Sequence, residues 1–149
     1  MAISGKDSGA LDLADELRPA LLRLSRQLRR ESQGSGLSPL DAQIIATIKH
    51  KAGIGVSELA DLELMTAPTM SAHIKRLEEE GFIARDDSAC TDKRRTALKI
   101  TRLGERALDS VRKRRNDWLA ARLSSLSEKE RQALRAAIAP LAHLAGDKL

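Results

Sequence analysis

The apolar residues of this chain recur at helical spacing over most of its length, with short interruptions. Near the N-terminus, leucines three or four residues apart predict one face of a helix that starts at Leu11. They are Leu13, Leu17, Leu21, Leu24 and Leu28. Because Pro19 lies inside this pattern, the helix either kinks there or begins near Arg18.

A loop at 33–39 separates this pattern from a second predicted helix. Ser38 is expected to cap that helix, with Pro39 at its first position and Gly53 at its end. Its apolar face consists of Leu40, Ile44, Ile45 and Ile48.

Two shorter helices are predicted next, separated by a tight turn. Ser57 is expected to cap the first, after a very short strand at 54–56. The apolar side of this helix comprises Leu59, Ala60 and Leu62, with Leu64 at its end. The second helix begins after the N-cap Thr66 and continues to Glu80. Its inward face consists of Met70, Ile74 and Leu77, with His73 at the border.

The outward face of the second short helix carries small and hydroxyl residues in its first half. Long charged residues appear only further along it. Such a helix start can approach a DNA groove closely and offer hydroxyls and amides to phosphates and bases. The candidate DNA-contacting residues are Thr66, Pro68, Thr69, Ser71, Ala72, Lys75 and Arg76. An ordinary capped surface helix would show the same residues, so this face alone leaves both interpretations open.

The residues after this helix favour DNA binding. Gly81 ends the helix, and the segments 82–85 and 96–100 are predicted strands on either side of a ten-residue loop. In this loop Asp92 can hold the Arg94 guanidinium in one orientation for a DNA minor groove. Lys93 and Arg95 can add phosphate contacts. The order of elements predicts a winged helix-turn-helix that places one helix in a major groove.

The chain resembles MarR-family transcriptional regulators over essentially its whole length. The resemblance rests on SELADLELMTAPTMSAHIKRLEEEGFIAR and TDKRRTALKITRLG, with Asp92, Arg94, Thr101 and Gly104 at the characteristic places. It implies an obligate homodimer on a pseudo-palindromic operator, and a ligand- or oxidant-responsive cleft between dimerisation helices and DNA-binding lobe. The sequence departs from the family at Ala72, where Arg is frequent, and at Ala89-Cys90, where Asp-Pro is common.

The apolar stripes outside the winged lobe predict dimerisation. After Gly104 the pattern is helical to the end, interrupted by a capping box from Ser127 to Glu130. The basic run at 112–115 is either a solvated face or a surface toward the DNA backbone. We expect a single mainly α domain, 1–149, with a small antiparallel β wing. Its DNA-binding lobe spans 37–104, and the N- and C-terminal dimerisation helices occupy 11–36 and 105–149. Half-sites should then lie one helical turn apart.

Composition narrows the classes of partner, location and ligand that the protein can have. The 26 Lys and Arg exceed the 21 Asp and Glu by 5, which weakly favours a polyanionic partner. No apolar run approaches the roughly 20 residues that span a bilayer, and no signal peptide is visible. The single cysteine fits a reducing cytoplasm. With one Trp, one Phe and no Tyr, an effector pocket would be lined mainly by aliphatic side chains, which favours an apolar small molecule.

No catalytic pattern is present. The three histidines are scattered, and no phosphate-binding glycine loop or metal-ligand spacing occurs, so we expect no enzymatic activity, cofactor or metal. The leading hypothesis is a repressor released by a small molecule. The alternatives are a non-specific nucleoid-type DNA binder, a redox-responsive regulator that uses Cys90, and a winged helix that binds only protein.

Overall fold

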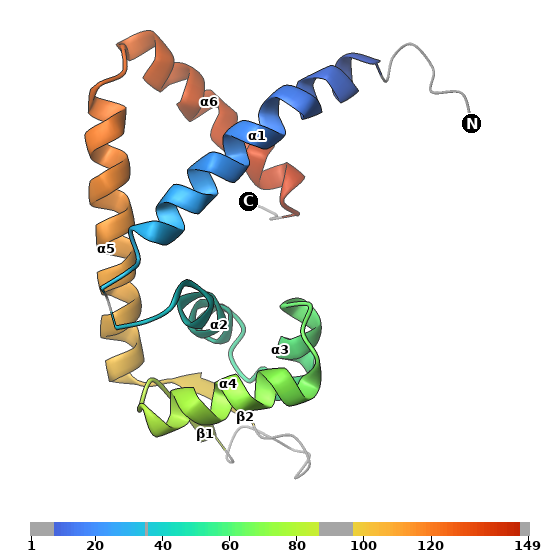
Figure 1. Cartoon of the computed structure of the whole chain (residues 1–149), viewed down its shortest axis with the longest axis vertical. Helices are drawn as coiled ribbons and strands as arrows, with labels where there is room; N and C mark the ends of the chain where they lie inside the picture. Colours follow the sequence, from blue (N-terminus) through green and yellow to red (C-terminus); the bar gives the residue numbers. More distant parts are fainter. Residues whose placement is uncertain (1–7, 35, 87–96, 147–149) are drawn as a thin grey trace. The chain divides into compact units, whose positions relative to one another are not determined.

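A computed structural model describes residues 8–34, 36–86 and 97–146 of the chain. The helices are α1 (Ser8–Arg30), α2 (Pro39–His50), α3 (Val56–Leu62), α4 (Ala67–Glu79), α5 (Arg102–Ser124) and α6 (Glu128–Leu144) (Figure 1). Between α4 and α5 the strands β1 (Ile83–Asp86) and β2 (Ala97–Ile100) form an antiparallel pair. The prediction of a mainly α fold with a small β wing is confirmed. The chain divides into two compact units, Met1–Arg115 and Asn116–Leu149, and α5 runs from the first into the second.

The hydrophobic core lies in the first unit and is aliphatic. The helices α2, α3 and α4 and both strands contribute to it, and the first half of α5 adds Leu108 and Val111. The predicted inward face of α4, Met70, Ile74 and Leu77, is completely buried. On α2 the three isoleucines are buried, whereas Leu40 is only half-buried. Burial of these side chains holds α4 on α2 and α3 through the hydrophobic effect.

The start of α3 differs from the prediction. Residues 54–56 form no strand, although the Ile54 carbonyl accepts one hydrogen bond from the Leu98 amide of β2 at 2.9 Å. The helix begins at Val56 with extended Gly55 as its N-cap, and no side chain caps it. Ser57 therefore lies inside the first turn and was wrongly assigned as the cap. Glycine is tolerated at an N-cap because it leaves the first amides accessible to water.

Two successive helices end in the same hydrogen-bonding motif. After α4, Phe82 N–H donates to the Leu77 carbonyl and Gly81 N–H to Glu78, with Gly81 at φ 81°. This confirms Gly81 as the residue that ends the helix. After α3, the amides of Met65 and Leu64 donate to Ala60 and Asp61 in the same way.

The residue in the left-handed position after α3 is not glycine but Leu64. It has a φ of 54° and is 94% exposed. Leu62 is also exposed. The predicted apolar side of α3 therefore ends at Ala60, since Leu62, at the last helical position, and Leu64, in the closing turn, are both exposed.

The start of α5 is fixed by Thr101 and Gly104. The Thr101 hydroxyl donates to the Gly81 carbonyl at 2.6 Å and accepts from the Gly104 amide at 3.1 Å. A Cβ on Gly104 would collide with the Phe82 carbonyl oxygen and lie 2.9 Å from Ile100 Cγ1. Only glycine lets α5 approach Phe82, the residue before β1, this closely.

The terminal helices α1 and α6 contain no buried residue. α1 starts at Ser8, earlier than predicted, and continues through Pro19, so the alternative start near Arg18 is wrong. α6 continues through Pro140 and begins with the predicted capping box between Ser127 and Glu130. None of the helices in the described part of the chain is long and apolar enough to cross a membrane.

Candidate nucleic-acid interface

The N-terminal half of α4 presents an exposed polar surface. Thr66 caps the helix: its hydroxyl oxygen accepts from the Thr69 amide at 3.4 Å and lies 2.8 Å from the Thr69 hydroxyl. Pro68 lies in the first turn, where its missing N–H costs no helical hydrogen bond. Six of the seven predicted α4 contacts are exposed: Thr66, Pro68, Thr69, Ser71, Ala72 and Lys75. The structure thus leaves all six accessible, five of them at the start of α4 and Lys75 further along it, and their contact with DNA stays a prediction.

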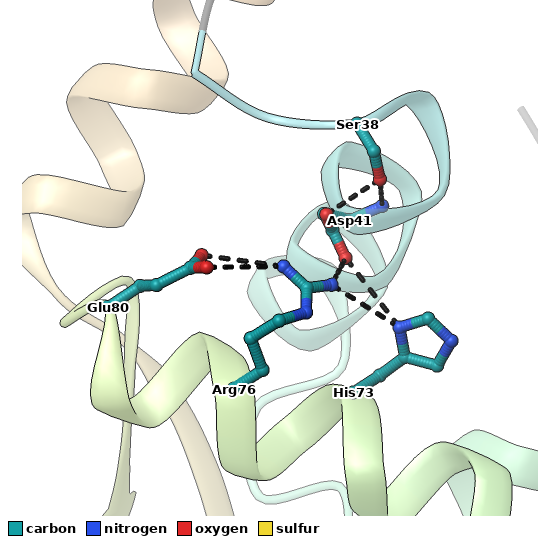
Figure 2. Close-up of polar contacts among 5 residues, drawn as sticks. All are labelled: Ser38, Asp41, His73, Arg76 and Glu80. Atoms are coloured by element: carbon teal, nitrogen blue, oxygen red, sulfur yellow. Dashed lines mark hydrogen bonds and ion pairs between the residues drawn. The ribbon is translucent and has the colours of Figure 1, made fainter.

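The seventh predicted residue, Arg76, is turned toward α2. Its Nη2 atom lies 2.5 Å from Asp41 Oδ1, and its Nη1 atom lies 3.4 Å from Glu80 Oε1 (Figure 2). His73 Nδ1 lies 3.4 Å from the same Nη2 atom and 3.7 Å from Asp41. The Arg76 side chain is 43% exposed, whereas that of Asp41 is only 4% exposed.

Asp41 is held as a buried carboxylate. The Ser38 hydroxyl donates to Asp41 Oδ2 at 2.6 Å, and the Asp41 amide donates to Ser38 Oγ, which is the predicted cap of α2. Burial raises the pKa of Asp41, but the hydrogen bonds from Arg76 and Ser38 and the Arg76 charge outweigh it. The pKa therefore lies below its usual value, and Asp41 is ionised at neutral pH.

A second ion pair joins α4 to the wing. Arg85 Nε on β1 donates to both carboxylate oxygens of Glu78 at 2.9 and 3.1 Å. Asp86, at the end of the same strand, lies 3.4 Å from Lys99 Nζ of β2. Sequence reasoning missed Asp41, Glu78 and Arg85. Asp41 and Arg76 are 35 residues apart, and no local spacing reveals such a pair.

The predicted wing-tip residues, Asp92, Lys93, Arg94 and Arg95, lie outside the described residues, as does Cys90. Their proposed contacts stay predictions. The strands that lead to the tip are described, with Ile83 opposite Ile100 and Asp86 opposite Ala97. The base of the predicted wing is therefore defined.

A cleft of about 570 Å³ lies among α1, α2 and α5 within the first unit. Its lining is mainly aliphatic, with two arginines: Leu21, Leu24, Ser25, Leu28, Arg29, Pro39, Ala42, Gln43, Ala46, Leu108 and Arg115. Arg115 donates to the Leu28 carbonyl and, at 2.8 Å, to Ser32 Oγ. Burial lowers the pKa of Arg115, and the nearby charge of Arg29 lowers it further.

The basic run of α5 has a structural role in its second half. Arg115 holds the end of α1, and Arg114 donates to the Gln33 carbonyl at 3.2 Å. Arg112 and Lys113 are exposed. Among the described residues, no three His, Cys, Asp or Glu side chains are grouped as a metal ion would require.

Comparison with known proteins defines the class. The MarR family model matches residues 37–96, which include α2, α3, α4 and β1. The chain is 32% identical over 125 residues to the uncharacterized HTH-type transcriptional regulator Mb0904 of Mycobacterium bovis, covering 84% of this chain and 87% of that protein. A crystal structure of a Pseudomonas aeruginosa protein has a TM-score of 0.80 and 31% identity, covering 95% of this chain and 99% of that one.

A second similar structure is that of a Staphylococcus aureus MepR mutant bound to an oligodeoxyribonucleotide. It has a TM-score of 0.64 and 17% identity, and covers 89% of this chain and 97% of that one. Together the fold, the family model and the relatives define a winged-helix DNA-binding transcriptional regulator. The chain belongs to the MarR family.

Proposed function

We propose that this protein is a repressor that binds a pseudo-palindromic operator as a homodimer and is released by a small molecule. The observation that carries the proposal is the start of α4, where small and hydroxyl side chains are exposed above a fully buried apolar face. A rigid helix with such an end can enter a major groove without steric conflict. In support, a structure of similar fold, that of an S. aureus MepR mutant, is bound to an oligodeoxyribonucleotide.

The proposed DNA contacts divide into two sets. From α4, Thr66, Pro68, Thr69 and Ser71 approach the bases closely, and Lys75 binds a phosphate. Ala72 offers no hydrogen-bond donor, so base discrimination rests on its neighbours. From the wing, Arg94 enters the minor groove with Asp92 as its orienting partner, while Lys93 and Arg95 bind phosphates.

The dimer is proposed from the terminal helices. Leu11, Leu13, Leu21, Leu22 and Leu24 of α1 are exposed, as are Leu134, Ile138 and Leu144 of α6. Each helix therefore presents an apolar stripe that no described residue of its own unit buries. A second copy supplies the same stripes, and a two-fold arrangement covers all of them.

The cleft among α1, α2 and α5 is the proposed effector site. Its volume suits a small molecule, and its aliphatic lining favours an apolar one. Pro39 and Ala42 of α2 line it, and α2 also supports α4 through Asp41. A ligand in the cleft therefore contacts the helix on which α4 rests.

The test of this function is selection of bound duplexes from fragmented genomic DNA by the purified protein. We expect enrichment of one or a few sites with a footprint of roughly 20 base pairs, made of two half-sites one helical turn apart. Equal affinity for the selected site and a random duplex at the same salt concentration would instead establish the nucleoid-type alternative.

A further inference from the structure

We propose that Arg76 is a positioning residue, which sets the orientation of α4 through Asp41 and makes no DNA contact itself. The inference rests on the proposed DNA-binding role of α4. It gives Arg76 a different role from Lys75, its neighbour in the chain and the other cation of this helix.

The contacts of Arg76 lead inward. One guanidinium binds Asp41 of α2 and Glu80 at the end of α4, and it lies beside His73 (Figure 2). The Asp41 carboxylate is 4% exposed and is bound from its other side by Ser38. If Arg76 turned to a phosphate, this buried carboxylate would lose its cation, which is strongly unfavourable. Lys75, in contrast, is exposed, and its Nζ lies 4.0 Å from Glu79 Oε1, one turn further along the same helix.

The pair supplies a constraint that the apolar core lacks. Met70, Ile74 and Leu77 fix which face of α4 is buried, but hydrophobic burial is non-directional and supplies no bond of fixed direction. A charge-assisted hydrogen bond to a fixed carboxylate specifies direction as well as distance. Because Asp41 lies in the first turn of α2, the Arg76 bond fixes α4 against that helix.

Glu78 adds a second fixed point through Arg85 of β1. The helix is thus held on one side by α2 and on the other by the wing. These two connections together set the orientation of its exposed start, from Thr66 to Ser71. Small rotations at these points displace the residues that must meet base edges.

The decisive variant is Asp41→Asn, which removes a buried negative charge and makes the protein one unit more positive. Net charge alone would strengthen DNA binding. Loss of the positioning bond should instead weaken it by about tenfold, with the salt dependence unchanged because no phosphate contact is lost. The measurement is fluorescence anisotropy of the full chain on the selected operator at several salt concentrations.

A second variant, Arg76→Lys, keeps the charge and the fold but cannot bind Asp41 and Glu80 together. We expect it to weaken operator binding with an unchanged salt slope. Arg76→Gln should do the same, whereas the matched control Lys75→Gln should reduce the slope of log affinity against log salt by about 0.9. Circular dichroism of each variant confirms that it is folded.

Two results would overturn the inference. One is an Asp41→Asn protein that binds the operator as tightly as the wild type or more tightly. The other is a pair of findings: Arg76→Lys binds the operator with wild-type affinity, and Arg76→Gln reduces the slope of log affinity against log salt as much as Lys75→Gln does. Failure of the proposed function itself looks different, because the wild type would then not distinguish the operator from random duplex.

Discussion

The winged lobe and the terminal helices use apolar residues in opposite ways. In the lobe, the aliphatic residues of α2, α3, α4 and the strands are buried within one chain, and polar bonds such as Arg76–Asp41 and Arg85–Glu78 connect the elements. α1 and α6 have apolar stripes of similar regularity but no buried residue. Equal periodicity thus specifies a helix in both regions. A closed core needs facing surfaces as well, and for the terminal helices we propose that a second copy supplies them.

The largest expected effect comes from breaking the closest approach in the lobe with Gly104→Ala. The new Cβ would overlap the Phe82 carbonyl oxygen, so α5 must separate from the wing. We expect a loss of about 4 kcal/mol or more in the free energy of unfolding, measured with urea. Gly9→Ala in α1 is the matched control, because nothing lies within 4 Å of its Cβ and alanine favours helix. Equal stability of both variants would contradict the close packing at Gly104.

The terminal helices are tested with Ile138→Asp. Ile138 is 61% exposed in the single chain, so the substitution leaves the monomer fold intact. In a two-fold dimer it places two charges in an apolar interface, and we expect dimer dissociation to become easier by about 3 kcal/mol, or more than 100-fold. Sedimentation equilibrium measures this. Gln132→Asp, on the opposite side of α6 from Leu134, should leave the dimer unchanged. An Ile138→Asp dimer of wild-type strength would show that α6 is not the interface.

The buried carboxylate predicts a pH dependence confined to the lobe. The pKa of Asp41 is lower in the folded protein than in the unfolded chain. The ionised carboxylate therefore stabilises the fold fully at a pH above its unfolded-state pKa, and this stabilisation is lost as the pH falls through its folded-state pKa. Asp41→Asn should therefore be about 1–2 kcal/mol less stable than the wild type at pH 7. This difference in stability between the two proteins should shrink below pH 3.8, the ordinary pKa of an Asp side chain. Urea unfolding of both proteins across this range measures it, and a constant difference would contradict the ionised pair.

The sequence predicted those features that depend on local order. The caps at Ser38, Thr66 and Ser127 and the end of α4 at Gly81 were predicted correctly, because each depends on residues within one turn. The buried stripe of α4 followed from helical periodicity. Family resemblance placed Thr101 and Gly104, and the structure supplies their physical reason in the contact with Gly81 and Phe82.

The remaining features depend on where elements meet. Periodicity placed Arg76 beside the outward face of α4, but it cannot show how far a long side chain reaches back, and Asp41 is remote in the sequence. Ser57 has a high N-cap propensity, but the N-cap of α3 lies two residues earlier, at Gly55, directly after Ile54 bonds to β2. The contacts of Arg94 and its neighbours stay predictions.

The smallest expected effect concerns the two matching helix ends. Leu64 occupies the left-handed position that Gly81 occupies one helix later, and a left-handed conformation costs a side-chain-bearing residue about 1–2 kcal/mol. Leu64→Gly removes that cost but increases the conformational entropy of the unfolded chain. We therefore expect the free energy of unfolding to rise by a net amount of about 0.5–1 kcal/mol. Gly81→Ala should lower the free energy of unfolding by about 1 kcal/mol. Its new Cβ would lie at an ordinary 3.5 Å from Leu103, so the cost comes from the left-handed backbone conformation. Urea unfolding of both variants would show opposite signs. A Leu64→Gly protein that is less stable than the wild type would contradict this prediction. It would mean that the Leu64 side chain stabilises the turn, although it is 94% exposed.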